Sequence, residues 1–179
     1  MNTESISDLL LDLATMSPLP ADNDPRMTPE FVDHYADILR RLKEQSVATL
    51  RSRSREIIRC VMSSFGTGEG YGTFQEAVHL LEAIDLGVLR EETREGLKSQ
   101  NLGTVYWCLH MLSRFRDSDD VGAISEFVNH PDRGIKLGAL VGLVCIGTNE
   151  AVEIASRFFD DDDPVIRLVL SQLRARAED

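Results

Sequence analysis

The sequence is poor in the aromatic residues that commonly fill β-sheet cores. Aromatic residues make up only 6% of its 179 residues, with a single tryptophan, whereas apolar residues as a whole make up 42%. Leucine, isoleucine, valine and alanine must therefore supply the core, which is typical of packed helices. The chain is long enough to bury one substantial core, so we predict a single helical-repeat domain over residues 1–179.

Positive charge is also scarce, since the formal net charge is −11. Such a charge repels phosphate backbones and anionic membranes, so we expect no nucleic acid and no membrane as partner and favour a protein with a basic surface. Residues 40–59 are the exception, with a net charge of +5 beside −7 for residues 1–39. Pairing of these bases with acidic neighbours in the chain is the interpretation we favour. Nucleic-acid binding through them is the alternative, and it would use Arg51, Arg53, Arg55 and Arg59.

Cysteines are few and long apolar runs are missing. Cys60, Cys108 and Cys145 are odd in number and far apart, which predicts reduced, mostly buried thiols. The chain starts with acidic rather than basic residues, unlike a signal peptide, and its longest mostly apolar run, residues 137–146, is too short to span a bilayer. We therefore expect a cytoplasmic protein.

A repeat with an offset of 31 residues is the strongest pattern present. It relates residues 115–132 to residues 146–163 through several independent apolar positions and a turn aspartate. The same offset extends one unit upstream, to residues 78–84. The matched pairs are Phe115 and Ile146, Val121 and Val152, Phe127 and Phe158, Val128 and Phe159, Asp132 and Asp163, Leu109 and Leu140, and Leu112 and Leu143.

Each repeat unit is predicted to be a pair of helices. Asp163-Pro164 and Thr28-Pro29 combine a capping side chain with a proline that fits the first helical turn, and Asp132 and Thr148 also suit N-caps. Thr73 and Glu76 have the spacing of a capping box. Further helices are expected over residues 5–16, 29–42, 47–65 with a break near 52–54, 74–86, 88–100, 135–146 and 164–177, and a proline-rich loop over 17–27.

These features predict an all-α fold: an α-α superhelix of about ten helices, stacked as antiparallel pairs. The turns at Asp132, Ile135 and Lys136 and at Asp163, Ile166 and Arg167, with Gly147 between them, resemble HEAT-like repeats of the phycobilin-lyase type. The resemblance is good over residues 104–179 and looser over 73–103, so it covers about residues 73–179; residues 1–72 are predicted to be diverged N-terminal helices. It implies a HEAT-like solenoid and leaves the function open.

Catalytic and metal-binding patterns are missing from the sequence. The four histidines are dispersed, and His79 and His110 are 31 residues apart, which indicates equivalent repeat positions rather than a ligand pair. The glycines of FGTGEGYG, residues 65–72, follow no strand and precede no P-loop lysine, so we interpret them as a flexible connector that could serve as a contact loop through Glu69 and Tyr71. We expect no enzyme, no cofactor and no metal.

Two acidic runs are candidates for contact with a partner. The first lies at a turn within a repeat and the second between repeats, so they are expected on opposite edges of the stack. Unpaired carboxylates repel one another, and an opposing basic surface would relieve this; a solvated turn is the alternative. Trp107 is a further candidate anchor, with core packing as its alternative. The acidic candidates are Asp117, Asp119 and Asp120, then Asp160, Asp161 and Asp162.

We therefore expect a non-catalytic, protein-binding module, and specifically a small inhibitor or immunity-like protein that occludes a partner effector. An adaptor or regulatory HEAT-like subunit of a larger assembly is the first alternative. A bilin-lyase-like chromophore-handling protein is the second, and only the resemblance suggests it.

Overall fold

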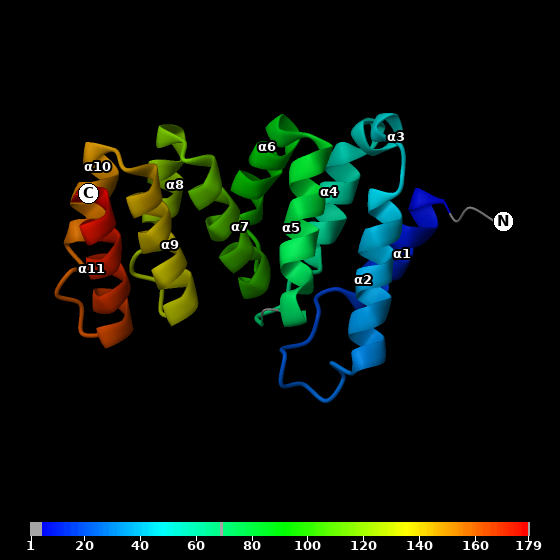
Figure 1. The fold of residues 1–179 in the computed structure, drawn as a ribbon, viewed down its shortest axis with the longest axis horizontal. Coiled ribbons are helices and arrows are strands. Elements are labelled where there is room, and N and C mark those ends of the chain that lie inside the picture. Colours follow the sequence, from blue (N-terminus) through cyan, green and yellow to red (C-terminus); the bar gives the residue numbers. More distant parts are fainter. Residues whose placement is uncertain (1–4, 69, 179) are drawn as a thin grey trace. The chain divides into compact units, whose positions relative to one another are not determined.

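The computed structural model describes residues 5–68 and 70–178, with side chains described as far as Ser171. The described chain is all-α and contains no strand, so the predicted helical, solenoid-like fold class is confirmed (Figure 1). Among the described helices, none combines the length and the apolar character needed to cross a membrane. The chain divides into two compact units, residues 1–107 and 108–179.

The first unit is built from two layers of helices. The helices α2 (Pro29–Lys43) and α5 (Thr73–Ile84) pack against each other in one layer, while α4 (Ser54–Ser63) packs against α1 (Ile6–Met16) and α6 (Leu86–Gly96) in the other. A short α3 (Val47–Ser52) precedes α4, with the helix break at the predicted place. Thr28 caps α2 as predicted, since its hydroxyl accepts a hydrogen bond from the Phe31 amide at 3.3 Å.

An aromatic cluster forms the core of the first unit. Phe74 stacks edge-on against Phe65 at a centroid distance of 5.3 Å, and Trp107 lies 5.5 Å from Phe65 and 5.6 Å from Phe74. Tyr35 adds a fourth ring, and its hydroxyl hydrogen-bonds that of Ser64 at 2.8 Å. The buried core is mostly aliphatic, as the composition predicts. Because aromatic rings bury large areas, these four residues nevertheless contribute more to it than their number suggests.

The glycine-rich loop is packed rather than free. The Gly70 amide donates to the Asp22 carboxylate at 2.9 Å, and the Tyr71 hydroxyl donates to the Asp22 carbonyl at 2.8 Å. A Cβ on Gly66 would lie 2.3 Å from the Leu19 carbonyl oxygen. The described residues of this segment, 65–68 and 70–72, thus contact the proline-rich loop 17–27, which the interpretation as a flexible connector did not anticipate.

The predicted capping box at Thr73 is also wrong. The helix does start at Thr73, but Gly72, with φ +88°, occupies the N-cap position. The Thr73 hydroxyl donates to the Gly70 carbonyl at 2.6 Å instead. The Thr73 hydroxyl therefore stabilises the glycine turn before the helix, and it does not cap the helix.

The second unit is arranged around one central helix. The helix α9 (Arg133–Ile146) packs against α8 (Val121–Ser125), α10 (Asn149–Ser156) and α11 (Pro164–Glu178), as expected for a helix that is apolar on nearly every side. The 3₁₀ turn η2 (Ser118–Asp120) precedes α8. Helix α7 (Leu102–Phe115) begins in the first unit and ends in this one.

Helix starts in the C-terminal half follow the predicted offset. Helices α7, α9 and α11 begin at residues 102, 133 and 164, which are 31 residues apart. Asp132 caps α9 by accepting from the Ile135 amide at 3.0 Å, and Asp163 accepts from the Val165 amide at 2.8 Å. Thr148 caps α10 in the same way. The sequence repeat thus marks equivalent helix starts.

Candidate functional site

Most of the bases of segment 40–59 form ion pairs within the first unit. Arg55 and Arg59 pair with glutamates of α6, and three other arginines pair with acids close to them in sequence. The predicted internal pairing is confirmed for five of the seven bases. The pairs between residues close in sequence are Arg40 with Asp37 and Glu44, Arg41 with Asp37, and Arg53 with Glu56. Little unbalanced positive charge remains on this segment for a phosphate backbone.

Glu92 is the buried centre of this ion-pair cluster. Only 3% of its side chain is exposed, yet both of its carboxylate oxygens accept hydrogen bonds from half-exposed arginines. Nε and Nη2 of Arg59 donate to Glu92, with the second bond at 3.2 Å, and Nη1 of Arg55 donates to it from the other side. A buried carboxylate is costly unless it is paired, so Glu92 and the two guanidinium groups hold one another in place.

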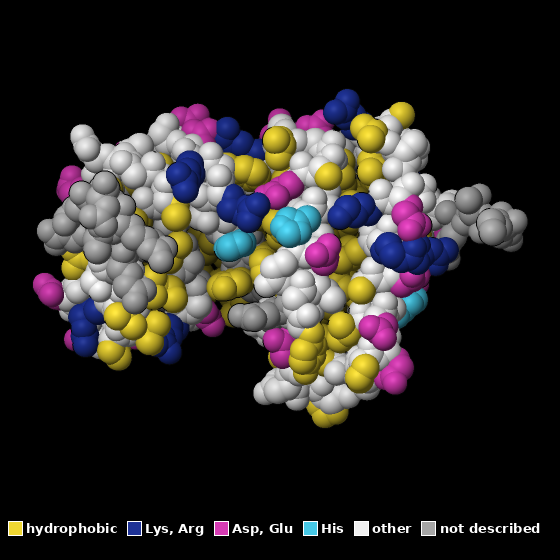
Figure 2. Space-filling view, in the orientation of Figure 1, with side chains coloured by type: hydrophobic (Ala, Val, Ile, Leu, Met, Phe, Trp, Pro, Cys, Tyr) yellow, Lys and Arg dark blue, Asp and Glu magenta, His cyan; other side chains and the backbone are white. Residues whose placement is uncertain are grey.

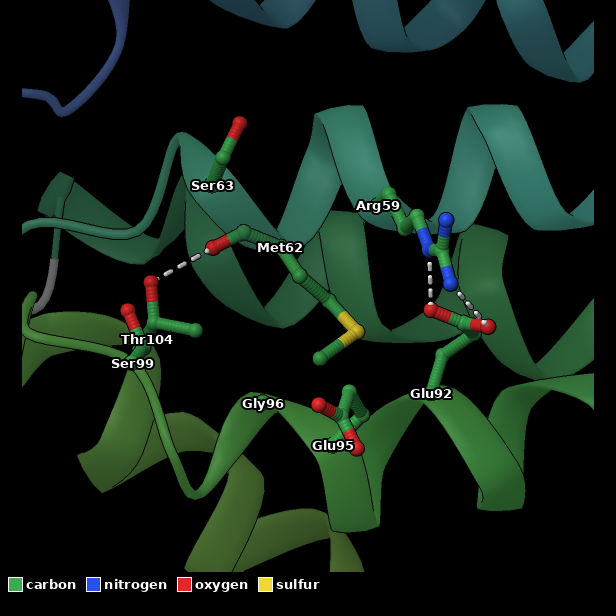
Figure 3. A pocket seen from close by; sticks show the side chains of 8 residues that line it. All are labelled: Arg59, Met62, Ser63, Glu92, Glu95, Gly96, Ser99 and Thr104. Atoms are coloured by element: carbon green, nitrogen blue, oxygen red, sulfur yellow. Dashed lines mark hydrogen bonds and ion pairs between the residues drawn. The ribbon is translucent and has the colours of Figure 1, made fainter.

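A hollow of about 370 Å³ lies beside this cluster, between α4 and α6 (Figure 3). The Met62 side chain points down between Thr104 and the Arg59–Glu92 pair, and Glu95 of α6 lies below it. The hydroxyl of Thr104, in α7, donates to the Met62 carbonyl at 3.0 Å, which ties the start of α7 to the end of α4. The residues that line this α4–α6 hollow are Arg59, Met62, Ser63, Glu92, Glu95, Gly96, Ser99 and Thr104.

A second, more open hollow adjoins it along α4 and shares Arg59 and Ser63. Cys60 lies on its wall, but burial, with a smaller contribution from Glu56, raises the pKa of its thiol to about 11. Burial likewise raises the pKa of Cys108. Thiols held in the protonated form are poor nucleophiles, so neither cysteine is activated for covalent chemistry.

Other reactive groupings are sparse in the part of the chain that the structure describes. No three metal-ligating side chains come together within the described ranges. His34 of α2 lies 2.9 Å from Asp12 of α1, which joins two neighbouring helices at the surface.

The acidic turn before α11 separates into paired and unpaired carboxylates. Asp161 bonds Lys136 at 2.6 Å, and this hydrogen bond lowers the pKa of Asp161. Asp163 caps α11 and pairs with Arg133, and its bond from the Val165 amide lowers its pKa most. Asp160 and Asp162 are exposed and form no hydrogen bond or ion pair with any described side chain. Only these two keep the unbalanced charge that the sequence suggested for the whole run.

Apolar side chains continue from this turn onto α11. Leu168 is 56% exposed, and Val165, one turn earlier, is also exposed. Figure 2 shows apolar side chains gathered over the first turns of α11. Val165 and Leu168 are three residues apart and so share one side of the helix start, and Asp160 and Asp162 lie in the turn just before it. We call Asp160, Asp162, Val165 and Leu168 the α11 surface.

The other acidic run lies at the opposite end of the helices of the second unit (Figure 1). Asp117 caps η2 by accepting from the Asp119 amide at 2.9 Å, and Asp119 is exposed. Asp120 is fully buried. It therefore cannot belong to a surface patch as predicted, because η2 turns its side chain inward.

Trp107 must also be removed from the candidate contact residues. It is 4% exposed and packs on Phe65 and Phe74, so core packing is the correct interpretation. Tyr71 remains exposed, although its hydroxyl is bonded to the loop around Asp22. Glu69, the other predicted contact of that loop, lies outside the described residues.

Sequence reasoning overlooked the apolar part of the α11 surface and the buried Glu92. Val165 and Leu168 belong to a helix with apolar residues on several sides. The sequence alone does not show which of these sides is exposed, because that depends on the helices that pack against it. Glu92 lies in the charged stretch REETRE, where nothing marks one acid as buried. Comparison of the chain with protein-family models, with curated proteins and with solved structures found no match.

Proposed function

We propose that this protein is a non-catalytic binding module that occludes a basic surface of a partner protein, in the manner of a small inhibitor or immunity-like protein. The α11 surface is the observation that carries the proposal. It combines exposed apolar side chains, Val165 and Leu168, with two carboxylates, Asp160 and Asp162, that pair with no described side chain. Three reduced cysteines suit the cytoplasm as its location.

The two kinds of side chain have different roles in binding. Full burial of a leucine or valine side chain contributes about 1.5–3 kcal/mol of hydrophobic free energy. Val165 and Leu168 are already partly covered, so each contributes only a fraction of that on binding. Exposed carboxylates add little affinity but attract a basic partner and speed its approach. The net charge of −11 extends the same attraction over a longer range.

An adaptor or regulatory subunit would use the same kind of surface, and the exposed face of α11 is equally compatible with it. The two functions differ in the number of partners. An inhibitor binds one dedicated effector, whereas an adaptor binds several proteins of one assembly.

The direct test is to co-express the protein with the product of the adjacent gene and to measure complex formation and growth. We expect a stoichiometric complex and relief of any toxicity of that product. Absence of both a complex and protection would remove the inhibitor proposal, and several co-purifying proteins would favour the adaptor.

For a purified complex, we predict that Asp160→Asn with Asp162→Asn slows association by about 3–10-fold at low salt while leaving dissociation almost unchanged. Stopped-flow measurements at two salt concentrations would show the difference shrinking as salt screens the charges. Asp161 is left in place because it pairs with Lys136.

The matched control is Asp33→Asn with Glu76→Gln, which removes two exposed carboxylates from the first unit. It should change the association rate far less. Equal slowing by both double variants would show that only the total charge matters and that Asp160 and Asp162 have no special position.

A further inference from the structure

The α4–α6 hollow lies where two helices end side by side. Helices α4 and α6 run in the same direction: Arg55 in the first turn of α4 pairs with Glu91 of α6, while Ser63 and Gly96, the last residues of the two helices, line the same hollow. The carbonyl end of each helix carries a partial negative charge. Two such ends together favour a cation at this place.

The arginines nearby do not cancel this preference. Arg59 is bonded to Glu92 through two of its nitrogens, and Arg55 is shared between Glu91 and Glu92. Their positive charges are balanced inside the cluster. The other carboxylate that lines the hollow is Glu95, which is exposed.

Glu95 already binds a cation of the chain itself, the ammonium group of Lys98. The Lys98 ammonium bonds Oε2 of Glu95 at 2.7 Å, and this bond lowers the pKa of Glu95, which is therefore ionised at neutral pH. Both side chains are largely exposed, so the pair is weak and exchangeable.

The floor of the hollow suits an aliphatic stem. The Met62 side chain lies across it, flanked by Gly96 and by Thr104, whose hydroxyl is used in a bond to the Met62 carbonyl. Lysine and arginine bury their methylene stems on apolar surface while the charged head stays among polar groups. A volume of about 370 Å³ is at the lower end for small-molecule sites and has room for one long side chain.

We infer that the α4–α6 hollow receives one unbranched, positively charged side chain of a protein partner, with its stem on Met62 and its charged head at Glu95 and the two helix ends. The inference adds a second contact site to the proposed function, and it rests on that function only in taking the side chain from a protein.

A lysine analogue tests the inference without any partner. Titration of the isotope-labelled protein with Nα-acetyl-lysinamide should shift the amide resonances of Gly96 and Ser99 in a saturable way. Nα-acetyl-norleucinamide, which has a stem of similar length without the charge, should bind more weakly, and Nα-acetyl-glutamamide should not bind there. Equal binding of the norleucine analogue, or preferred binding of the glutamate analogue, would overturn the inference.

Two variants should change the affinity in opposite directions. Glu95→Gln should weaken binding of the lysine analogue about fivefold, and Lys98→Ala should strengthen it about two- to threefold by removing the competing ammonium. The matched control is Glu153→Gln, because Glu153 forms an equally exposed pair with Arg157 on α10. An unchanged affinity in Glu95→Gln would rule out the hollow as a cation site, while the proposal for the α11 surface would be unaffected.

Discussion

Replacing Trp107 by alanine is expected to lower the free energy of unfolding by about 3–5 kcal/mol. The indole is buried against Phe65 and Phe74, at centroid distances of 5.5 and 5.6 Å. Truncation removes this contact and leaves a cavity that the surrounding rings cannot fill, because they are fixed by their own packing. Urea unfolding followed by far-UV circular dichroism would measure the loss.

The neighbouring residue provides the control. Tyr106 contacts the Trp107 ring edge-on but is partly exposed. Tyr106→Ala should therefore lower the free energy of unfolding by only about 1 kcal/mol. If the two variants were equally stable, Trp107 would not be the core residue described above and would again be a candidate anchor for a partner.

Gly103→Ala is expected to destabilise the protein by about 1–3 kcal/mol, although alanine is normally the better helix residue. Gly103 lies in the first turn of α7, and a Cβ there would be 2.2 Å from the Gly66 carbonyl oxygen and 2.5 Å from that of Phe65. Both obstacles are backbone atoms of the packed glycine loop. To relieve this clash, α7 must move away from the glycine loop, and that movement weakens the contacts between the helix and the loop.

Gly122 gives the opposite expectation and serves as the control. It is also helical, in α8, but a Cβ there meets nothing within 4 Å. Gly122→Ala should stabilise the protein by about 0.5–1 kcal/mol, because alanine has less conformational freedom to lose on folding. The comparison uses thermal or urea unfolding of both variants. Stabilisation by both substitutions would mean that α7 does not approach the glycine loop so closely.

The features that could be predicted from sequence are those that depend on neighbours along the chain. Thr28, Asp132 and Thr148 cap the helices that follow them because an N-cap oxygen needs only a nearby amide. The 31-residue offset indicates equivalent helix starts at residues 133 and 164 for the same reason: each repeat carries its own turn and cap.

The features that could not be predicted depend on contacts distant in sequence. Thr73 and Glu76 have the spacing of a capping box, but the Thr73 hydroxyl donates to the Gly70 carbonyl, because the glycine loop places that carbonyl within hydrogen-bond distance. Asp120 belongs to an acidic run in the sequence, and only the turn of η2 shows that it is buried. Local patterns do not reveal which of several similar residues faces inward.

The same limit applies to the candidate sites. The sequence indicated Asp160, Asp161 and Asp162 as one group, but Lys136 of α9 pairs with Asp161, and of the three only Asp160 and Asp162 pair with no described side chain. The exposure of Leu168 follows from what packs on α11, and the burial of Glu92 follows from the approach of α4. Composition can suggest a binding protein, whereas the exposed residues that could form a contact surface are identified only in the folded chain.

The most direct test of the proposed role is the dissociation constant of the complex with Leu168→Arg, compared with Leu11→Arg. Both leucines lie within helices and are strongly exposed, at 56% and 68%, so neither change should unfold the protein. If the α11 surface binds a basic partner, Leu168→Arg should raise the dissociation constant by a factor of about ten or more, because it removes apolar contact and introduces a like charge, whereas Leu11→Arg should change it less than about twofold. Equal dissociation constants for the two variants, or a larger effect at Leu11, would contradict the assignment of the α11 surface as the contact with the partner.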